Sequence, residues 1–220
     1  MLAMTFKAVI FDLDGTLLDT IEDLTEAMNA ALAKMGFPLR SVEECKKLVG
    51  DGLDTYVRRA LPARARDDAA AAARLKVLMR DEYRARCDHK TRPYEGIPEL
   101  LDGLTGRGVR MAVLSNKPHE ATTAVMSLYF SGWRFEIIFG ARDGIPVKPD
   151  PRSALDIARR MGLAPGVIVY LGDTNTDMQT ATAAGMFAVG ALWGFRTAEE
   201  LTSNGANLLI ENPTDLLALF

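Results

Sequence analysis

The feature that most limits the fold of this chain is the alternation of short apolar runs with helical patterns. Runs rich in β-branched residues predict strands at residues 6–11, 109–114, 136–139, 167–171 and 187–192, with a weaker sixth at 207–210. Helical spacing fills the intervals at 97–104, 118–128, 151–161 and 178–184. Several strand runs are apolar throughout, which is typical of a parallel sheet covered on both faces. The pattern predicts a doubly wound, parallel α/β sheet of Rossmann-like type.

One stretch, from about residue 19 to residue 91, interrupts this alternation. It contains no convincing strand, and its spacing predicts helices at 21–35, 42–49, 53–61 and 67–86. We therefore expect an all-helical cap domain, residues 19–91, inserted after the first strand. Residues 1–18 and 92–220 would form the α/β core domain.

Charge and composition limit the partners. The 220 residues carry a formal net charge of −3 and no long basic run, so nucleic acid and acidic membranes are not expected as partners. No apolar stretch approaches the roughly 18 residues of a membrane span, and the N-terminus lacks the features of a signal peptide. Cys45 and Cys87 have no metal-ligand spacing and are expected to be free thiols. Together these features predict a cytoplasmic protein.

Two carboxylates follow the first predicted strand. Asp12 and Asp14 are two residues apart in an extended segment, so both can face one ligand, and Gly15 permits a turn directly after them. In open α/β sheets, ligands bind beyond the carboxyl ends of the strands. An acidic turn that caps the next helix would explain the same residues, and this spacing alone does not decide between the two.

The other strand ends favour the site. Ser115 and Asn116 follow the second long strand and could hold phosphate oxygens, although both residue types are also common helix caps. Lys148 lies between strand and helix in KPDP, where a lone lysine is usually a surface residue. Asp173 and Asp177 follow the VIVYL strand and add two more carboxylates. Carboxylate oxygens in this number suit Mg²⁺.

In order and spacing, four segments resemble the signature motifs of the haloacid dehalogenase-like hydrolases. These are DLDGTLLDT, SNK, KPDP and GDTNTD, and the resemblance covers essentially the whole chain. Within the family the chain is similar to the phosphoglycolate phosphatase-like branch, as VGDG in the cap, AAGM and WGFRT also indicate.

The resemblance implies a Mg²⁺-dependent phosphatase that acts on a small phosphorylated metabolite through an aspartyl-phosphate intermediate. It implies that Asp12 is the nucleophile and Asp14 the general acid and base. The metal ligands would be the Asp12 carboxylate, the Asp14 backbone carbonyl and the Asp173 carboxylate.

The remaining implied roles are supporting ones. Lys148 and Ser115, assisted by Asn116, would hold the transferring phosphoryl group, and Asp177 would orient metal-bound water or Lys148. The cap loop Gly50, Asp51 and Gly52 would contribute to substrate specificity.

Several alternatives remain open at this point. Asp14 disfavours a dehalogenase or a phosphonate-cleaving enzyme, which lack an aspartate there. A pyrophosphatase and a β-phosphoglucomutase-like phosphotransferase share the same core residues. A catalytically idle protein that uses its cap for interaction is a more remote reading. The sequence leaves open whether the protein is a monomer or a homodimer.

Overall fold

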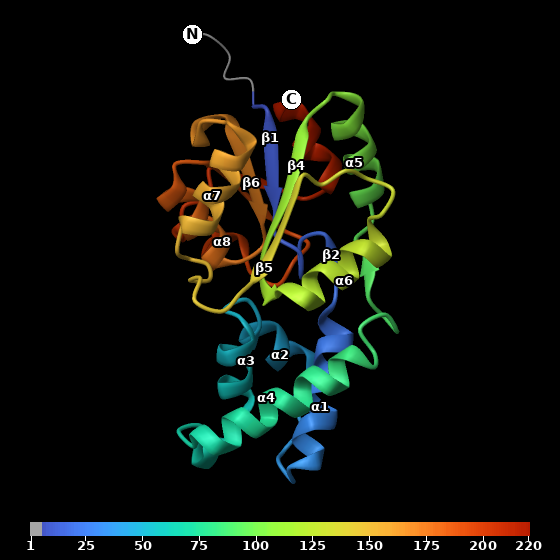
Figure 1. Ribbon diagram of the computed structural model, residues 1–220, viewed down its shortest axis with the longest axis vertical. Helices are drawn as coiled ribbons and strands as arrows, with labels where there is room; N and C mark the ends of the chain where they lie inside the picture. Colours follow the sequence, from blue (N-terminus) through green and yellow to red (C-terminus); the bar gives the residue numbers. More distant parts are fainter. Residues whose placement is uncertain (1–5) are drawn as a thin grey trace.

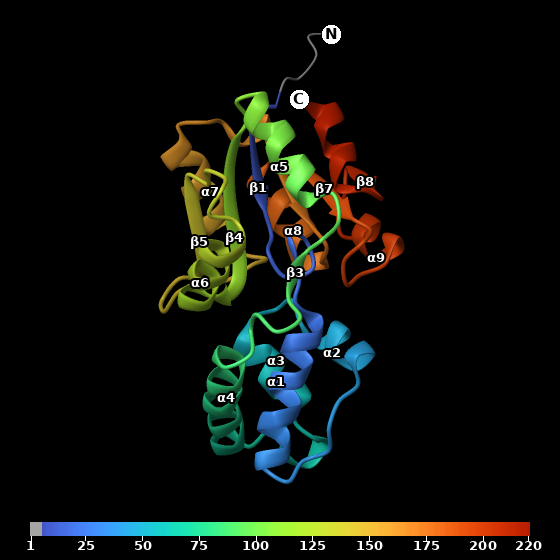
Figure 2. The same cartoon turned by 90° about the vertical axis from the view of Figure 1, so that its right-hand side faces the viewer.

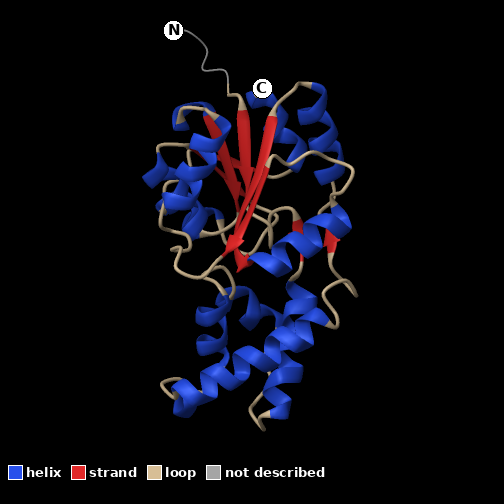
Figure 3. Ribbon diagram, in the orientation of Figure 1, coloured by secondary structure: helices blue, strands red, loops and turns tan. Residues whose placement is uncertain are grey.

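The computed structural model of the chain, which describes residues 6–220, is built on a six-stranded parallel sheet (Figure 3). The strand order is β5 (Ile137–Ala141), β4 (Arg110–Pro118), β1 (Ala8–Phe11), β6 (Ile168–Gly172), β7 (Phe187–Ala191) and β8 (Leu208–Ile210). From the central β1 the chain winds first to β4 and β5 and then back across to β6. The predicted doubly wound sheet is confirmed, and its strand order reverses at β1, where such folds bind ligands.

Helices cover both faces of the sheet (Figures 1 and 2). One face packs on α5 (Ile97–Gly106), α6 (His119–Tyr129) and the 3₁₀ helix η3 (Pro213–Leu219); the other packs on α7 (Arg152–Met161), α8 (Asn175–Ala184) and α9 (Ala198–Ser203). The period of two along β1 divides its side chains between the faces. Val9 and Phe11 join one apolar cluster, and Ala8 and Ile10 join the other. A short 3₁₀ helix, η2 (Pro165–Val167), precedes β6.

Four further helices lie beyond the carboxyl ends of the strands (Figure 1). They are α1 (Ile21–Lys34), α2 (Val42–Leu48), α3 (Leu53–Ala60) and α4 (Ala69–Arg84), with the 3₁₀ helix η1 (Ala63–Ala65) between the last two. Ser41 and Glu44 form a capping box at the start of α2, and the Asp68 side chain caps α4. These helices enclose an apolar cluster of their own, which includes Met28, Leu32 and Leu75.

The chain passes twice between the sheet and these four helices, and the two passages are tied together. β2 (Leu18–Asp19) pairs antiparallel with β3 (Arg92–Pro93). The buried Asp23 carboxylate also accepts hydrogen bonds from the backbone of Lys90 and Thr91. The sequence pattern does not predict β2 and β3, because two residues are too few to show alternation.

Two element boundaries differ from the prediction by more than two residues. The strand expected to end at Leu114 continues to Pro118, with a shift in its register against β5 between these residues. Ser115 and Asn116 therefore lie inside the strand and not after it. Irregularities of this kind change the direction in which nearby side chains point. Helix α8 begins at Asn175, one turn earlier than its apolar spacing indicates. Within residues 6–220, no helix is long and apolar enough to cross a membrane.

Candidate active site

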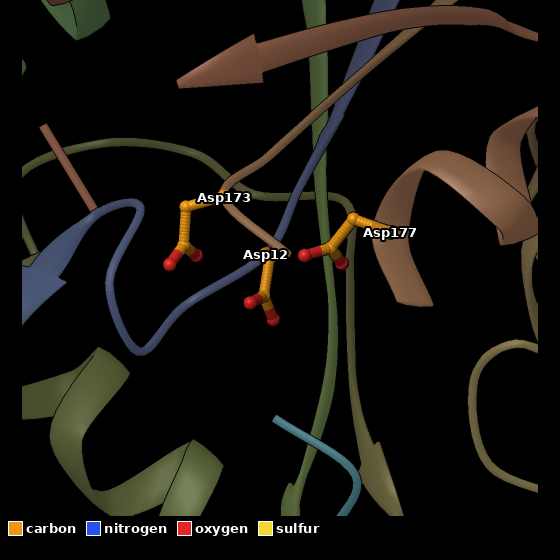
Figure 4. A group of neighbouring side chains, drawn as sticks. All are labelled: Asp12, Asp173 and Asp177. Carbon is orange, nitrogen blue, oxygen red and sulfur yellow. The ribbon is translucent and has the colours of Figure 1, made fainter. Parts of the chain in front are cut away.

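Three buried carboxylates meet at the carboxyl ends of β1 and β6. Asp12 follows β1, Asp173 follows β6 and Asp177 lies in the first turn of α8; one oxygen from each lies within 4.8 Å of the others (Figure 4). Burial raises the pKa of Asp12 well above its usual range, and the nearby charge of Asp177 raises it further. Burial, followed by the same charge, raises the pKa of Asp173 to about 7. Carboxylates this close are ionised together only when cations offset their repulsion.

Lys148 supplies one of these positive charges. Its Nζ donates to Oδ1 of Asp12 at 2.7 Å and to Oδ1 of Asp177 at 2.6 Å, and the residue is 3% exposed. Burial alone would lower the pKa of Lys148, but the carboxylates of Asp12 and Asp177 outweigh it and raise the pKa. Lys148, which its position in the sequence alone would place at the surface, therefore bridges two of the three carboxylates.

The three carboxylates differ in how fully their oxygens are engaged. Asp177 accepts from Lys148 and Tyr170 at Oδ1, and from the Thr174 backbone and hydroxyl at Oδ2. Asp12 accepts only at Oδ1 among the described residues and faces the cavity. Asp177 is thus occupied as a support for Lys148, whereas Asp12 keeps an oxygen available for a ligand or a reaction.

A tight turn brings the segment after β1 against Asp173. Gly15 has φ +90°, and a Cβ there would lie 2.4 Å from Oδ2 of Asp173, so only glycine fits. Thr16 then donates its hydroxyl to Oδ1 of Asp173 at 2.8 Å, and the Phe195 backbone N–H donates to Oδ2 at 2.8 Å. Both donors fix the orientation of this carboxylate.

The cluster fits a hard divalent cation. Its donors are carboxylate oxygens, and burial and mutual repulsion oppose their ionisation without a cation. Among residues 6–220, Lys148 is the one lysine paired with the cluster, and it contacts Asp12 and Asp177 but not Asp173. The residues predicted as metal-ligating, Asp12, Asp14 and Asp173, all belong to the two segments that meet here.

Asp14 pairs with a lysine to which the sequence pattern assigns no role. Lys117 Nζ lies 2.7 Å from Oδ1 of Asp14 and 4.5 Å from the centre of the Tyr83 ring in α4. Burial would lower the pKa of Lys117, but Asp14 and Tyr83 together outweigh it and raise the pKa. Lys117 stands in the quoted SNK motif, but nothing in the spacing shows that it reaches Asp14.

Ser115 and Asn116 are both buried, but they lie differently from each other. Both line the cavity, and the Ser115 hydroxyl accepts a hydrogen bond from the Lys117 backbone N–H. The Asn116 amide group donates to the carbonyls of Gly50 and Lys148 at 3.0 Å each, and its Oδ1 accepts from the Lys148 backbone at 2.8 Å. The side chain of Asn116 therefore holds the Lys148 segment and the Gly50 loop in place in this structure.

A cavity of about 180 Å³ separates the sheet edge from the four helices. Asp12, Asp14, Ser115 and Lys117 line one side, and the opposite wall is mainly apolar, with Leu24, Leu53, Tyr56, Met79 and Tyr83. Gly50 and Gly52 of the predicted specificity loop also line it. Asp51, between them, does not line the cavity and pairs with Arg59.

Arg196 joins the sheet to the same loop. It follows Phe195, and its guanidinium donates to the carbonyl oxygens of Lys46 at 2.5 Å and Val49 at 2.7 Å. The segment that orients Asp173 thus also contacts the end of α2. The segment WGFRT indicates the family resemblance but not this contact, because no period or spacing in the sequence points to residues so distant in the chain.

The family model of the haloacid dehalogenase-like hydrolases matches residues 9–191, which include every residue of the acidic cluster. The chain belongs to this family. A phosphoglycolate phosphatase of Pseudomonas putida is 34% identical over 215 residues, which are 96% of this chain and 78% of the relative. A phosphoglycolate phosphatase of Xylella fastidiosa is 33% identical, over 94% of this chain and 90% of the relative.

Solved structures agree with this placement among the haloacid dehalogenase-like hydrolases. A crystal structure from Lactobacillus delbrueckii subsp. bulgaricus, of a candidate phosphoglycolate phosphatase, has a TM-score of 0.91 and 31% identity. The match covers 98% of this chain and 99% of the other. The predicted family and its phosphoglycolate phosphatase-like branch are confirmed.

Proposed function

We propose that this protein is a Mg²⁺-dependent phosphatase that hydrolyses a small phosphate monoester, with 2-phosphoglycolate as the first candidate. The observation that carries the proposal is the bridge from Lys148 to Asp12 and Asp177, beside Asp173, with Asp12 at the wall of a cavity. The names of the Pseudomonas and Xylella relatives support the choice of substrate.

Asp12 would begin the reaction. Its free carboxylate oxygen attacks phosphorus, a bond forms between that oxygen and phosphorus, and the bond from phosphorus to the ester oxygen breaks. Lys148 and Ser115 hold the equatorial oxygens of the phosphoryl group and offset the charge that develops there. The product of this step is an aspartyl phosphate on Asp12.

Asp14 would act as the general acid in the first step and as the general base in the second. It gives a proton to the departing ester oxygen, and it later takes one from the water that attacks phosphorus. The second step breaks the bond between phosphorus and Asp12, releases inorganic phosphate and restores the carboxylate. For this role Asp14 must leave the contact with Lys117 that it makes in the structure.

The ion would be held by the carboxylates of Asp12 and Asp173 and the backbone carbonyl of Asp14, with Asp177 supporting Lys148 from behind. When bound, Mg²⁺ neutralises charge on the phosphoryl oxygens. The hydrogen bond that Oδ1 of Asp12 accepts from Lys148 orients the carboxylate, so that its other oxygen can attack phosphorus.

We further propose that residues 19–91 move as a cap domain relative to a core of residues 1–18 and 92–220. The two tied passages, β2 with β3, are the place for a hinge. Closure would bring Gly50 and Gly52 over the substrate and exclude water. Location in the cytoplasm and the choice between monomer and homodimer stay predictions.

The test is phosphate release from a panel of small phosphate esters and pyrophosphate, with and without Mg²⁺, by the wild type and Asp12→Asn. We expect release that requires both Mg²⁺ and Asp12 and is fastest on 2-phosphoglycolate. Fastest release from pyrophosphate would overturn the substrate choice. Release that persists in Asp12→Asn, or no release from any ester, would contradict the proposed mechanism.

A further inference from the structure

Lys117 is a buried cation that the phosphoryl-transfer chemistry does not use. Its side chain is 4% exposed, it lines the cavity, and its nearest charged partner is Asp14 at 2.7 Å. The face of the Tyr83 ring lies on another side of the ammonium, 4.5 Å from Nζ to the ring centre. An ammonium ion has three donors, so Lys117 can accommodate the approach of a second carboxylate while it still contacts Asp14, and can then exchange Asp14 for it.

The other cations that line the cavity are placed at its mouth. The Arg80 and Arg84 side chains are 52% and 66% exposed, and both face Glu120, at 4.0 and 3.7 Å. Among the cavity-lining residues in the described part of the chain, Lys117 is the one buried cation. An anionic group inside the cavity would therefore find its strongest partner at Lys117, because charge interactions are least screened where water is excluded.

The position of Lys117 relative to Asp14 sets where that anionic group must lie. Asp14 is the residue proposed to protonate the ester oxygen, and Lys117 Nζ donates a hydrogen bond to Oδ1 of Asp14. Asp12, Asp14 and Lys117 line the same cavity, so an ester with its phosphoryl group against Asp12 and its ester oxygen facing Asp14 would direct the rest of its short chain toward Lys117. A carboxylate on that short chain is the anionic group that would lie there.

We propose that Lys117 determines specificity by binding a carboxylate on the alcohol part of the substrate, which selects phosphate esters of short hydroxy acids. This inference rests on the proposed phosphatase function. The carboxylate takes the contact with Lys117 that Asp14 makes in the structure, so the correct substrate also frees Asp14 to face the ester oxygen. An ester without this charge lacks the group that displaces Asp14.

The experiment compares 2-phosphoglycolate with ethyl phosphate, which has the same chain length and no carboxylate. We measure kcat and KM for both esters with the wild type, Lys117→Met and the matched control Arg84→Met. Charge-assisted hydrogen bonds correspond to about 10- to 100-fold, so the preference for 2-phosphoglycolate in kcat/KM should fall by about this factor in Lys117→Met. Arg84→Met should keep the wild-type preference.

The ratio separates a contact with substrate from a general effect on Asp14 or on folding, because either general effect slows both esters equally. An equal loss on both esters, or loss of preference in Arg84→Met instead, would overturn the role of Lys117. Binding of the two esters to Asp12→Asn, with and without Lys117→Met, gives the same comparison by calorimetry without turnover. If the wild type hydrolyses no phosphate ester at all, the phosphatase proposal itself fails. If it hydrolyses esters but the preference for 2-phosphoglycolate over ethyl phosphate is unchanged in Lys117→Met, only the role of Lys117 is overturned.

Discussion

The two sides of the cavity are built from different kinds of interaction. On the sheet side, buried charges pair across long stretches of sequence, as Lys148 does with Asp12, 136 residues away. In the four helices opposite, many charged pairs are local and exposed, as in the pair of Lys46 with Glu43. The wall those helices present to the cavity is mainly apolar. The comparison indicates that the sheet side fixes the chemistry, while the helices shape the space for the substrate.

The largest effect should come from removing the central cation on the sheet side. Lys148→Ala should lower kcat/KM by at least about 10²- to 10³-fold, or ~2.7–4 kcal/mol, because a fixed donor to the phosphoryl oxygens is lost. It also leaves buried carboxylates without their cation, so the melting temperature should change as well. Steady-state kinetics and calorimetric melting measure the two effects.

The matched control is Lys76→Ala in the helices, whose exposed pair with Asp54 should contribute little. Turnover within a few-fold of the wild type in Lys148→Ala would break the comparison, because the sheet side would then not carry the chemistry.

The acidic cluster should make the metal-free protein sensitive to pH. Folding raises the pKa of Asp173 from 3.8 to about 7, so between these values the folded state binds more protons than the unfolded state. The free energy of unfolding should therefore fall as pH rises from about 4 to about 7, by an amount on the order of a few kcal/mol. Asp173→Asn should remove the part of this fall that Asp173 causes and raise the melting temperature at pH 8 without metal, while the raised pKa of Asp12 leaves the remainder.

Asp156→Asn is the control, because the pKa of Asp156 is shifted in the opposite direction. The hydrogen bond that its carboxylate accepts from Arg159 lowers that pKa. That variant should gain no stability at pH 8. Excess Mg²⁺ should raise the melting temperature of the wild type more than that of Asp173→Asn. A metal-free wild type whose stability rises steadily from pH 4 to pH 8, with no gain from Asp173→Asn, would contradict the account of the cluster.

The contact between the two sides can be tested at Arg196. Arg196→Ala removes two hydrogen bonds from a charged donor to the carbonyl oxygens of Lys46 and Val49. We expect kcat/KM for the preferred ester to fall by about 10-fold, because hydrogen bonds to charged groups contribute ~1.5–3 kcal/mol and water can replace part of this. Proteolysis of the α2–α3 segment should become faster.

Arg159→Ala, at a side chain 75% exposed, is the control and should change neither measurement. Arg196→Ala could instead lower kcat/KM for both ethyl phosphate and the preferred ester without faster proteolysis of the α2–α3 segment. That result would show that Arg196 acts through Asp173 and not through this segment.

Much of the sheet side could be predicted from the sequence because its residues follow strand ends. Once the parallel strands are known, Asp12 and Asp173 must lie at the same edge, and only the reach of Lys148 is left to the structure. The contacts of Lys117 with Asp14 and of Arg196 with Val49 span 103 and 147 residues, and no periodic pattern marks them. The direction of the Asn116 side chain could not be predicted from the sequence either, since an irregularity in β4 sets where it points.

The smallest effect should come from the predicted specificity loop itself. Asp51→Asn should change kcat/KM by less than about threefold, because its side chain pairs with Arg59 and does not line the cavity. Kinetics on 2-phosphoglycolate and ethyl phosphate measure this. A tenfold loss confined to one ester would show that Asp51 reaches the substrate when the cap closes.

The most direct test of the central claim uses Asp14→Asn with p-nitrophenyl phosphate and Mg²⁺. The p-nitrophenolate leaves without a proton donor, so Asp12 can still be phosphorylated, whereas loss of the base slows the attack of water. We predict a burst of p-nitrophenolate equal to the enzyme concentration, and a phosphoryl group on the peptide that contains Asp12 after acid quench and mass spectrometry. Turnover with no burst and no phosphorylated Asp12 would contradict the claim that the sheet side reacts through this residue.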